Sequence, residues 1–291
     1  MTTRKAGAET GTRSIVIADN DVFLLEAISE LLRDKGYEVH TACDGLEALQ
    51  AIRRLRPDHV ILDILMPRID GSRVCWLIRQ DQKLRDTPVI AFSGLGPKDI
   101  RKFPELSADA YVAKGPLAAV ANNILLAIKH LEAKGRGDFE GGTFGYEEFR
   151  PRHLITEMLT FKKHYEALVR MFEYGVLELD PEGRILMANA RASEILGRKE
   201  IHLIAEPLPA VLPPRSRRVI QQMLNEVRKA SPPKESRTVI PIRGQEVSVG
   251  FSSTVEDGKC TAVLVTLKPR EPEAGNRKEG PDVRKGDRKK T

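Results

Sequence analysis

The first 133 residues alternate short apolar runs with segments whose apolar side chains recur every three or four positions. Short apolar runs between polar turns predict buried strands, and a repeat of three to four residues predicts a helix with one buried face. Strands are predicted at 14–18, 37–42, 59–63, 88–92 and 108–113, and helices at 24–32, 46–55, 70–78 and 118–131. Because parallel strands need helical crossovers, this order predicts a doubly wound α/β fold with a five-stranded parallel sheet.

Polar side chains follow several of these strands at the point where each strand ends. Asp19 and Asn20 follow the first strand, and Asp63 ends the third. Ser93 follows the fourth strand and Lys114 the fifth. Taken alone, an aspartate at a strand end is more often a loop cap, and a lysine is more often a solvated surface charge. Because the carboxyl ends of parallel strands share one edge of the sheet, where ligands bind in such folds, the set predicts a polar site there.

The middle of the chain changes in composition. Five of the eleven residues at 135–145 are glycine, which predicts a linker over 134–153. Apolar residues then recur at spacings of four and three over 154–172, which predicts a helix with a coiled-coil seam. That helix either pairs with a second copy of the chain or caps the domain that follows, and both interpretations remain open. The seam consists of Leu154, Met158, Phe161, Tyr165, Leu168 and Phe172.

Residues 175–268 follow a different plan. Two short strands flank the turn Asp180–Gly183, where proline and glycine favour a hairpin. Helices are predicted at 190–196 and 216–227, and the stretch between them, with four prolines at 207–214, is predicted to be an irregular loop. Strands at 237–242, 246–253 and 260–267 complete an α+β domain with an antiparallel sheet.

Four motifs in the first half, at 15–21, 57–71, 87–94 and 108–114, together resemble the receiver domain of two-component response regulators over residues 13–133. The resemblance implies that Asp63 is the phosphoacceptor, whose carboxylate takes a phosphoryl group from the phosphohistidine of a sensor histidine kinase or phosphotransfer protein. It also implies that Lys114 and Ser93 contact the phosphoryl oxygens and that Tyr111 is the aromatic switch. Mg²⁺ would be held by oxygen atoms of Asp19, Asn20, Asp63 and the backbone carbonyl of Leu65.

Two positions depart from the receiver pattern. Asn20 stands where the family has a second acid that contacts the metal directly, although the carboxylate of Asp21 is next to it. An amide oxygen can ligate Mg²⁺ but removes one negative charge. Gly115 also separates Lys114 from the proline that usually follows the lysine. A phosphorylatable receiver is favoured, and a non-phosphorylatable pseudo-receiver that serves as a scaffold is the alternative.

Residues 172–197 resemble the start of a PAS domain, and the strands through Leu267 extend the similarity over 166–268. Some PAS domains bind haem, flavin or metabolites, and others only dimerise. Cys260 lies on a predicted strand, not on a helix that could present it to a flavin. His202 is interpreted as a surface or packing residue and not as a haem ligand. No cofactor is therefore predicted for this domain, and its ligand is left unknown.

The net charge of the 291-residue chain is +6, and much of the excess lies at its ends. Residues 269–291 hold eight Lys or Arg and five Asp or Glu with few apolar side chains, which predicts a disordered basic tail. No helix-turn-helix or zinc pattern accompanies the tail, so nucleic-acid binding is not predicted. The three cysteines are far apart, which argues against disulfides and zinc. Without a long apolar run or a signal sequence, a cytoplasmic protein with no membrane contact is predicted.

These patterns together predict a response regulator of a two-component phosphorelay that signals through a PAS domain by protein contacts. A homodimer through the PAS domain and the linking helix is expected. No kinase or other output enzyme is predicted, and self-catalysed phosphoryl transfer to Asp63 is the only chemistry expected. The alternative is a component of a hybrid sensor kinase system, for which His164 is the candidate phosphorylated histidine. The flanks of His164 do not match a phosphotransfer motif.

Overall fold

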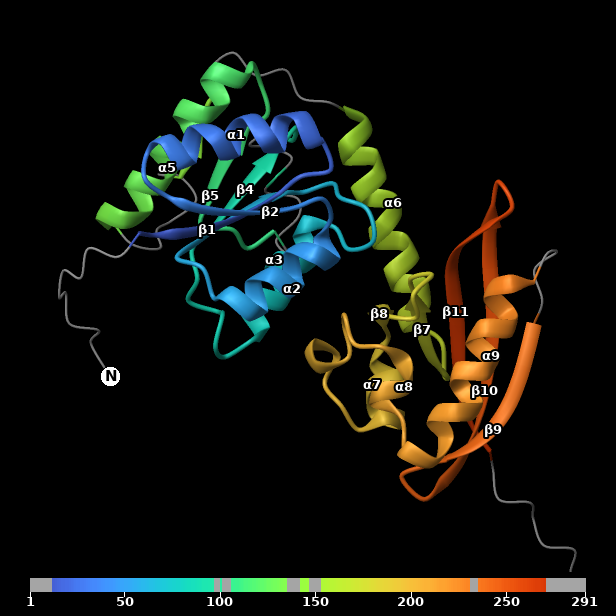
Figure 1. Cartoon of the computed structure of the whole chain (residues 1–291). Coiled ribbons are helices and arrows are strands. Elements are labelled where there is room, and N and C mark those ends of the chain that lie inside the picture. Colours follow the sequence, from blue (N-terminus) through green and yellow to red (C-terminus); the bar gives the residue numbers. More distant parts are fainter. Residues whose placement is uncertain are drawn as a thin grey trace, which may run out of the picture.

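Two β-sheets organise the computed structural model (Figure 1), which describes residues 12–96, 100, 106–134, 142–146, 153–230 and 235–270. The first sheet is parallel throughout and has the order β2-β1-β3-β4-β5-β6. The chain crosses over between β1 and β3, so two neighbouring strands end beside each other at a topological switch point. Its strands are β1 (Ser14–Ala18), β2 (Glu38–Ala42), β3 (His59–Asp63), β4 (Val89–Ser93), β5 (Ala110–Ala113) and β6 (Thr143–Phe144).

Helices cover both faces of this sheet. Figure 1 shows α1 (Val22–Asp34) and α5 (Leu117–Lys134) on one face, with α2 (Gly45–Leu55) and α3 (Gly71–Gln80) on the other. Alternate strand residues therefore enter two separate apolar clusters, as the two-residue period of a strand requires. An aspartate caps the amino end of α1, α2 and α3, and each side chain accepts a backbone N–H of the first turn.

The predicted doubly wound parallel sheet is confirmed, and it gains a strand that the sequence analysis assigned to the glycine-rich linker. The two residues of β6 pair with Tyr111 and Val112 of β5, and the N–H of Tyr111 also donates to the carbonyl of Gly142. Two residues are too few to produce an apolar alternation. Residues 135–141 and 147–152 of the predicted linker, and the predicted tail from 271 onward, lie outside the described residues.

The second sheet is antiparallel and has the order β8-β7-β11-β10-β9. The predicted hairpin, the three later strands and both helices are present. The irregular stretch is shorter than predicted, because it contains one turn of α-helix (Leu208–Val211) and two turns of 3₁₀-helix (Glu200–His202 and Pro214–Ser216). Its elements are β7 (Gly175–Leu179), β8 (Ile185–Ala188), α7 (Ala190–Leu196), α8 (Leu208–Val211), α9 (Arg217–Lys229), β9 (Glu235–Ile242), β10 (Gln245–Glu256) and β11 (Lys259–Pro269).

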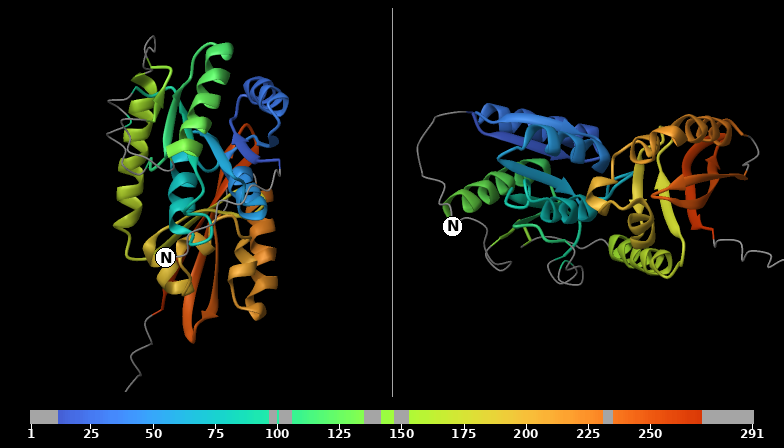
Figure 2. Two further views of the ribbon diagram at one scale, coloured as in Figure 1. Left: turned by 90° about the vertical axis from the view of Figure 1, so that its left-hand side faces the viewer. Right: turned by 90° about the horizontal axis from the view of Figure 1, so that it is seen from below.

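The linking helix α6 (His153–Arg170) runs from the parallel sheet to the antiparallel sheet (Figures 1 and 2). The predicted helix is present, but its apolar seam does not cap the following domain. Phe161 is 76% exposed and Leu168 is 62% exposed, and Met158, Tyr165 and Phe172 are also exposed. The helix instead buries Leu159 against the first domain, and Val169 is buried near its other end. The seam is therefore a solvent-facing apolar stripe.

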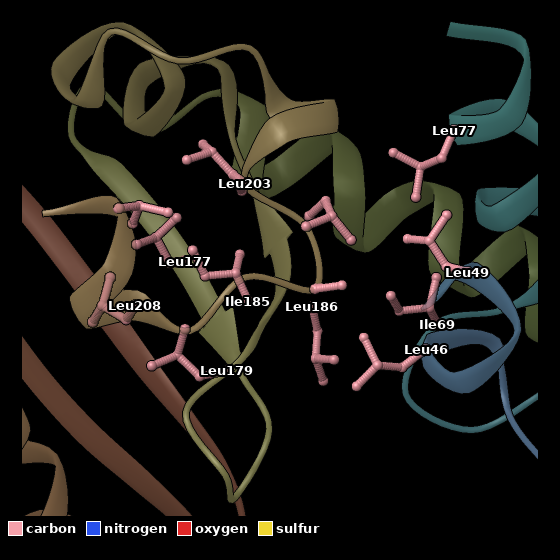
Figure 3. Packing of buried hydrophobic residues seen from close by; sticks show 14 of the residues in the cluster. Leu46, Leu49, Ile69, Leu77, Leu177, Leu179, Ile185, Leu186, Leu203 and Leu208 are labelled. Atoms are coloured by element: carbon pink, nitrogen blue, oxygen red, sulfur yellow. The ribbon is translucent and has the colours of Figure 1, made fainter. Parts of the chain in front are cut away.

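The two domains share one contiguous apolar cluster. Figure 3 shows Leu46, Leu49 and Leu77 of the first domain on one side, with Leu186 and other leucines of the second domain facing them. Polar contacts flank the cluster. The Arg53 guanidinium donates to the carbonyls of Ile201 and Ile204 at 2.5 and 2.9 Å, and Arg73 pairs with Glu200. The domains therefore dock directly as well as through α6.

Candidate functional site

Two buried carboxylates and one lysine meet at the carboxyl edge of the parallel sheet. Ala18 pairs with Leu62 in the sheet, so the next residues of the two strands, Asp19 and Asp63, lie side by side. Lys114 follows β5, and its Nζ is 2.8 Å from Asp19 Oδ2 and 2.9 Å from Asp63 Oδ2. Asp19 is 2% exposed and Asp63 is 5% exposed. The structure thus brings together three residues, of which the first and the last, Asp19 and Lys114, are 95 positions apart in the sequence.

Burial has the largest effect on the pKa of the Asp63 carboxyl group. Loss of hydration raises the pKa of the Asp63 carboxyl group to about 6, and the charge of Asp19 adds to this rise. The ammonium of Lys114 and the N–H of Leu65, which donates to the Asp63 carboxylate, act in the opposite direction. At neutral pH the side chain is therefore mainly a carboxylate with poor hydration. Such a group can act as an oxygen nucleophile toward an electrophile that enters this edge.

Ser93 and Tyr111, the other predicted site residues, are both buried. The Ser93 hydroxyl oxygen accepts the N–H of Leu95 at 2.9 Å, which leaves its own proton able to donate. The Tyr111 ring points inward, where its hydroxyl donates to the carbonyl of Leu106, and burial raises its pKa. Tyr111 belongs to an apolar cluster with Ile64, the residue after Asp63. The structure therefore shows the inward position of the predicted switch residue.

Each predicted metal ligand offers an oxygen atom. Asp19 and Asp63 contribute carboxylates and Leu65 a backbone carbonyl, while Asn20 lies exposed directly after β1. This donor set fits Mg²⁺, which prefers oxygen ligands and binds through one or two carboxylates. Asp21 caps α1 by accepting the Leu24 N–H at 3.1 Å, so one of its oxygens is engaged. Within the described residues, no group of three His, Cys, Asp or Glu side chains could hold a metal.

Two contacts around this site, made by Phe92 and Lys162, have no signal in the sequence. The Phe92 ring lies beneath Lys114, with its centroid 4.9 Å from Nζ. Lys162 of α6 contacts Asp70, which ends the loop after Asp63. The apolar position of Phe92 in a strand gave no sign of a contact with lysine, and nothing in the sequence links Lys162 to a loop about 90 residues earlier.

The apolar interior of the second domain lies where α7, α8 and α9 face the sheet. Aliphatic side chains such as Leu177, Ile220 and Val265 are fully buried there. His202 lies on the surface, and Cys260 is partly exposed near the start of β11. His164 is exposed on α6. Among the described helices, none has the length and apolar character needed to cross a bilayer.

Family models match both halves of the chain. The family model for the response regulator receiver domain matches residues 15–121, and that for the PAS fold matches residues 163–278. The relative RpaA of Synechocystis, a DNA-binding dual master transcriptional regulator, is 34% identical over 164 residues, which cover 50% of this chain and 68% of RpaA. The chain thus belongs to the response regulators, with a receiver domain followed by a PAS domain.

Other relatives match about a third of the chain. The response regulator DivK of Brucella ovis is 31% identical over 104 residues, 35% of this chain and 85% of DivK. The DNA-binding response regulator MtrA of Mycobacterium tuberculosis is 33% identical over 107 residues, 36% of this chain and 46% of MtrA. The chain therefore spans less than half of MtrA. The crystal structure of the phosphorylated cyanobacterial phytochrome response regulator RcpA aligns with 43% of this chain and 96% of its own at 26% identity and a TM-score of 0.38.

Proposed function

We propose that this chain is a phosphorylatable response regulator whose receiver accepts a phosphoryl group on Asp63 and passes the signal to its PAS domain. The observation that carries this proposal is the convergence of Asp19, Asp63 and Lys114 within 3 Å contacts at one sheet edge. The donor would be the phosphohistidine of a histidine kinase or phosphotransfer protein. Transfer to its own Asp63 is the only chemistry proposed for this chain, and a cytoplasmic location is part of the proposal.

In the proposed reaction, a carboxylate oxygen of Asp63 attacks phosphorus, a P–O bond forms, and the P–N bond to the donor imidazole breaks. The ammonium of Lys114 and the hydroxyl of Ser93 would stabilise charge on the phosphoryl oxygens. Asp19, Asp63 and the Leu65 carbonyl, with the amide of Asn20, would hold Mg²⁺, which when bound neutralises part of the phosphoryl charge. Burial of Asp63 keeps water away from the nucleophile.

The output surface we propose is the exposed seam of α6, through which two copies form a homodimer together with their PAS domains. The seam keeps the heptad spacing of a coiled coil and is exposed along its described length, at Met158, Phe161, Tyr165, Leu168 and Phe172. Exposed apolar stripes of this kind mark interaction sites. Nucleic-acid contact is not part of this proposal.

A specific observation favours a second candidate, a pseudo-receiver that serves as a scaffold. Asn20 replaces a carboxylate, so the described site holds two acids, both already in contact with Lys114. With one negative charge fewer, such a site would hold Mg²⁺ less tightly and react more slowly, or not at all.

The deciding experiment is labelling of the full chain by acetyl phosphate with Mg²⁺, followed by intact mass. We expect a gain of one phosphoryl group on wild type and none on Asp63→Asn. Asp34→Asn is the matched control, because Asp34 is an exposed acid at the end of α1, by the opposite edge of the sheet. If wild type stays unlabelled and Asn20→Asp gains the group, the pseudo-receiver is the correct reading.

A further inference from the structure

The loop between β3 and α3 connects Asp63, the proposed phosphorylation site, to residues that contact α6. It starts at Asp63 and ends at Asp70, and the Gly71 N–H closes it by donating to the Ile64 carbonyl at 3.0 Å. Gly71 packs so closely that an added Cβ would lie 2.0 Å from the carbonyl oxygen of Asp63. The same loop supplies the Leu65 N–H to the Asp63 carboxylate. A displacement of its far end is therefore transmitted to Asp63.

Helix α6 contacts both ends of this loop. At the near end, Leu159 is 4% exposed in a cluster with Ile64, and Leu65 packs against that cluster. At the far end, the Lys162 ammonium pairs with the Asp70 carboxylate and lies 3.4 Å from the Ser72 hydroxyl. Leu159 and Lys162 are three positions apart, so they lie on the same side of the helix. That side of α6 therefore contacts the loop near both of its ends.

Lys162 makes the charged contact between α6 and this loop. Burial alone would raise the pKa of Asp70, but the charge and hydrogen bond of Lys162, with the Ser72 hydroxyl and Arg73 N–H, hold it below its usual value. A cleft of about 350 Å³, lined by Ser72, Trp76 and Lys162 among others, lies between α3 and α6. Since α6 does not pack tightly on α3 there, the Lys162 contact is a discrete link and not one part of a continuous apolar interface.

The other end of α6 is fixed to the PAS domain. The side-chain amide of Asn189 donates to the carbonyls of Val169 and Tyr174 at 3.2 and 3.0 Å, and its oxygen accepts the N–H groups of Val176 and Ala192 at 2.9 and 2.8 Å. One side chain thus ties the end of α6 to β7 and α7. The helix is held at the phosphorylation loop by Lys162 and at the PAS domain by Asn189.

We infer that Lys162, which lies outside the receiver domain, is a positioning residue for the phosphorylation of Asp63. The inference rests on the proposed function of Asp63. Lys162 holds Asp70, and through the closed loop it sets the position of the Leu65 N–H and carbonyl beside the reacting carboxylate. Coupling between two sites is reciprocal, so phosphorylation of Asp63 that moves this loop also changes the contact between Lys162 and Asp70. Helix α6 therefore responds to phosphorylation.

The test is the Mg²⁺ dependence of acetyl phosphate labelling, measured on the full chain by intact mass over time. Loss of a residue that orients metal ligands typically costs ten- to a hundredfold in metal affinity or activity, and we expect the lower end, about tenfold, for Lys162→Gln. The half-saturating Mg²⁺ concentration should rise, and Lys162→Arg should restore most of the rate because it keeps the charge. Lys129→Gln on the exposed side of α5 is the matched control and should equal wild type.

The outcomes separate this inference from the proposed function. If wild type takes no label, the proposed function fails and the inference fails with it. If wild type is labelled and Lys162→Gln matches it in rate and in Mg²⁺ half-saturation, the inference alone is overturned. It is also overturned if Lys162→Gln is slow with unchanged Mg²⁺ dependence and without rescue by Lys162→Arg. Circular dichroism melting of each variant checks that the folded state is retained.

Discussion

Replacing Asp63, the proposed phosphoacceptor, with asparagine should make the receiver more stable at neutral pH. Burial raises the pKa of Asp63 to about 6, whereas an aspartate in an unfolded chain has a pKa near 3.9. A folded-state pKa above the unfolded value means that the folded state binds the proton more tightly. The free energy of unfolding should therefore fall as the pH rises from about 4 to about 6 and then level off.

The magnitude follows from the same shift. A difference of about two pKa units at about 1.4 kcal/mol per unit corresponds to about 3 kcal/mol of destabilisation by the ionised Asp63 at pH 7.5. Asparagine has nearly the shape of the protonated side chain and carries no charge, so Asp63→Asn removes this cost. Lys114 keeps its contact with Asp19 in the variant. We expect Asp63→Asn to be more stable than wild type by about 2–3 kcal/mol at pH 7.5, and by little at pH 4.

The assay is urea unfolding without divalent cations, followed by tryptophan fluorescence. Trp76 is the only tryptophan of the chain and lies on α3 of the receiver, so the signal reports on this domain. The exposed control Asp34→Asn should stay within about 0.5 kcal/mol of wild type at both pH values. The reasoning would be refuted if Asp63→Asn were no more stable than wild type at pH 7.5, or if its advantage were the same at pH 4.

Three further predictions concern other contacts. Arg79→Ala should destabilise the receiver by about 3–5 kcal/mol in urea unfolding, since it leaves the Asp109 carboxylate buried without the guanidinium that lies 2.6 Å away; a loss below about 1 kcal/mol would contradict this. Gly71→Ala should cost more than about 1 kcal/mol and slow acetyl phosphate labelling, because its Cβ would clash with the Asp63 carbonyl, whereas Gly115→Ala, with open space around it, should do neither. Phe161→Glu and Leu168→Glu should turn a dimer into a monomer in sedimentation velocity, while Lys129→Gln should not; a wild-type chain that is monomeric at high concentration would refute the role of the seam.

The sequence predicted the fold class of both domains because the two domains have strong and different periodicities. Buried strands such as Val60–Leu62 are apolar without interruption because both faces are covered, and this pattern together with intervening helices leaves few topologies. The strand β6 escaped detection because its two residues pair in the sheet through backbone atoms, and a backbone pairing of this length leaves no side-chain pattern.

The sequence also identified the parts of the candidate site, since Asp19, Asp63 and Lys114 each lie at the carboxyl end of a strand whose place was predictable. Only the tertiary structure determined the burial of these residues and the contacts among them. The burial that raises the pKa of Asp63 and the shared contact of both acids with Lys114 depend on packing from segments far apart in the chain. The heptad spacing specified an apolar seam on α6 but not whether it faces the protein or the solvent. The orientation of α6 is determined by contacts of residues that lie between the seam positions, namely Leu159, Lys162 and Val169. The local period does not encode these contacts, because they join segments that are distant in the chain.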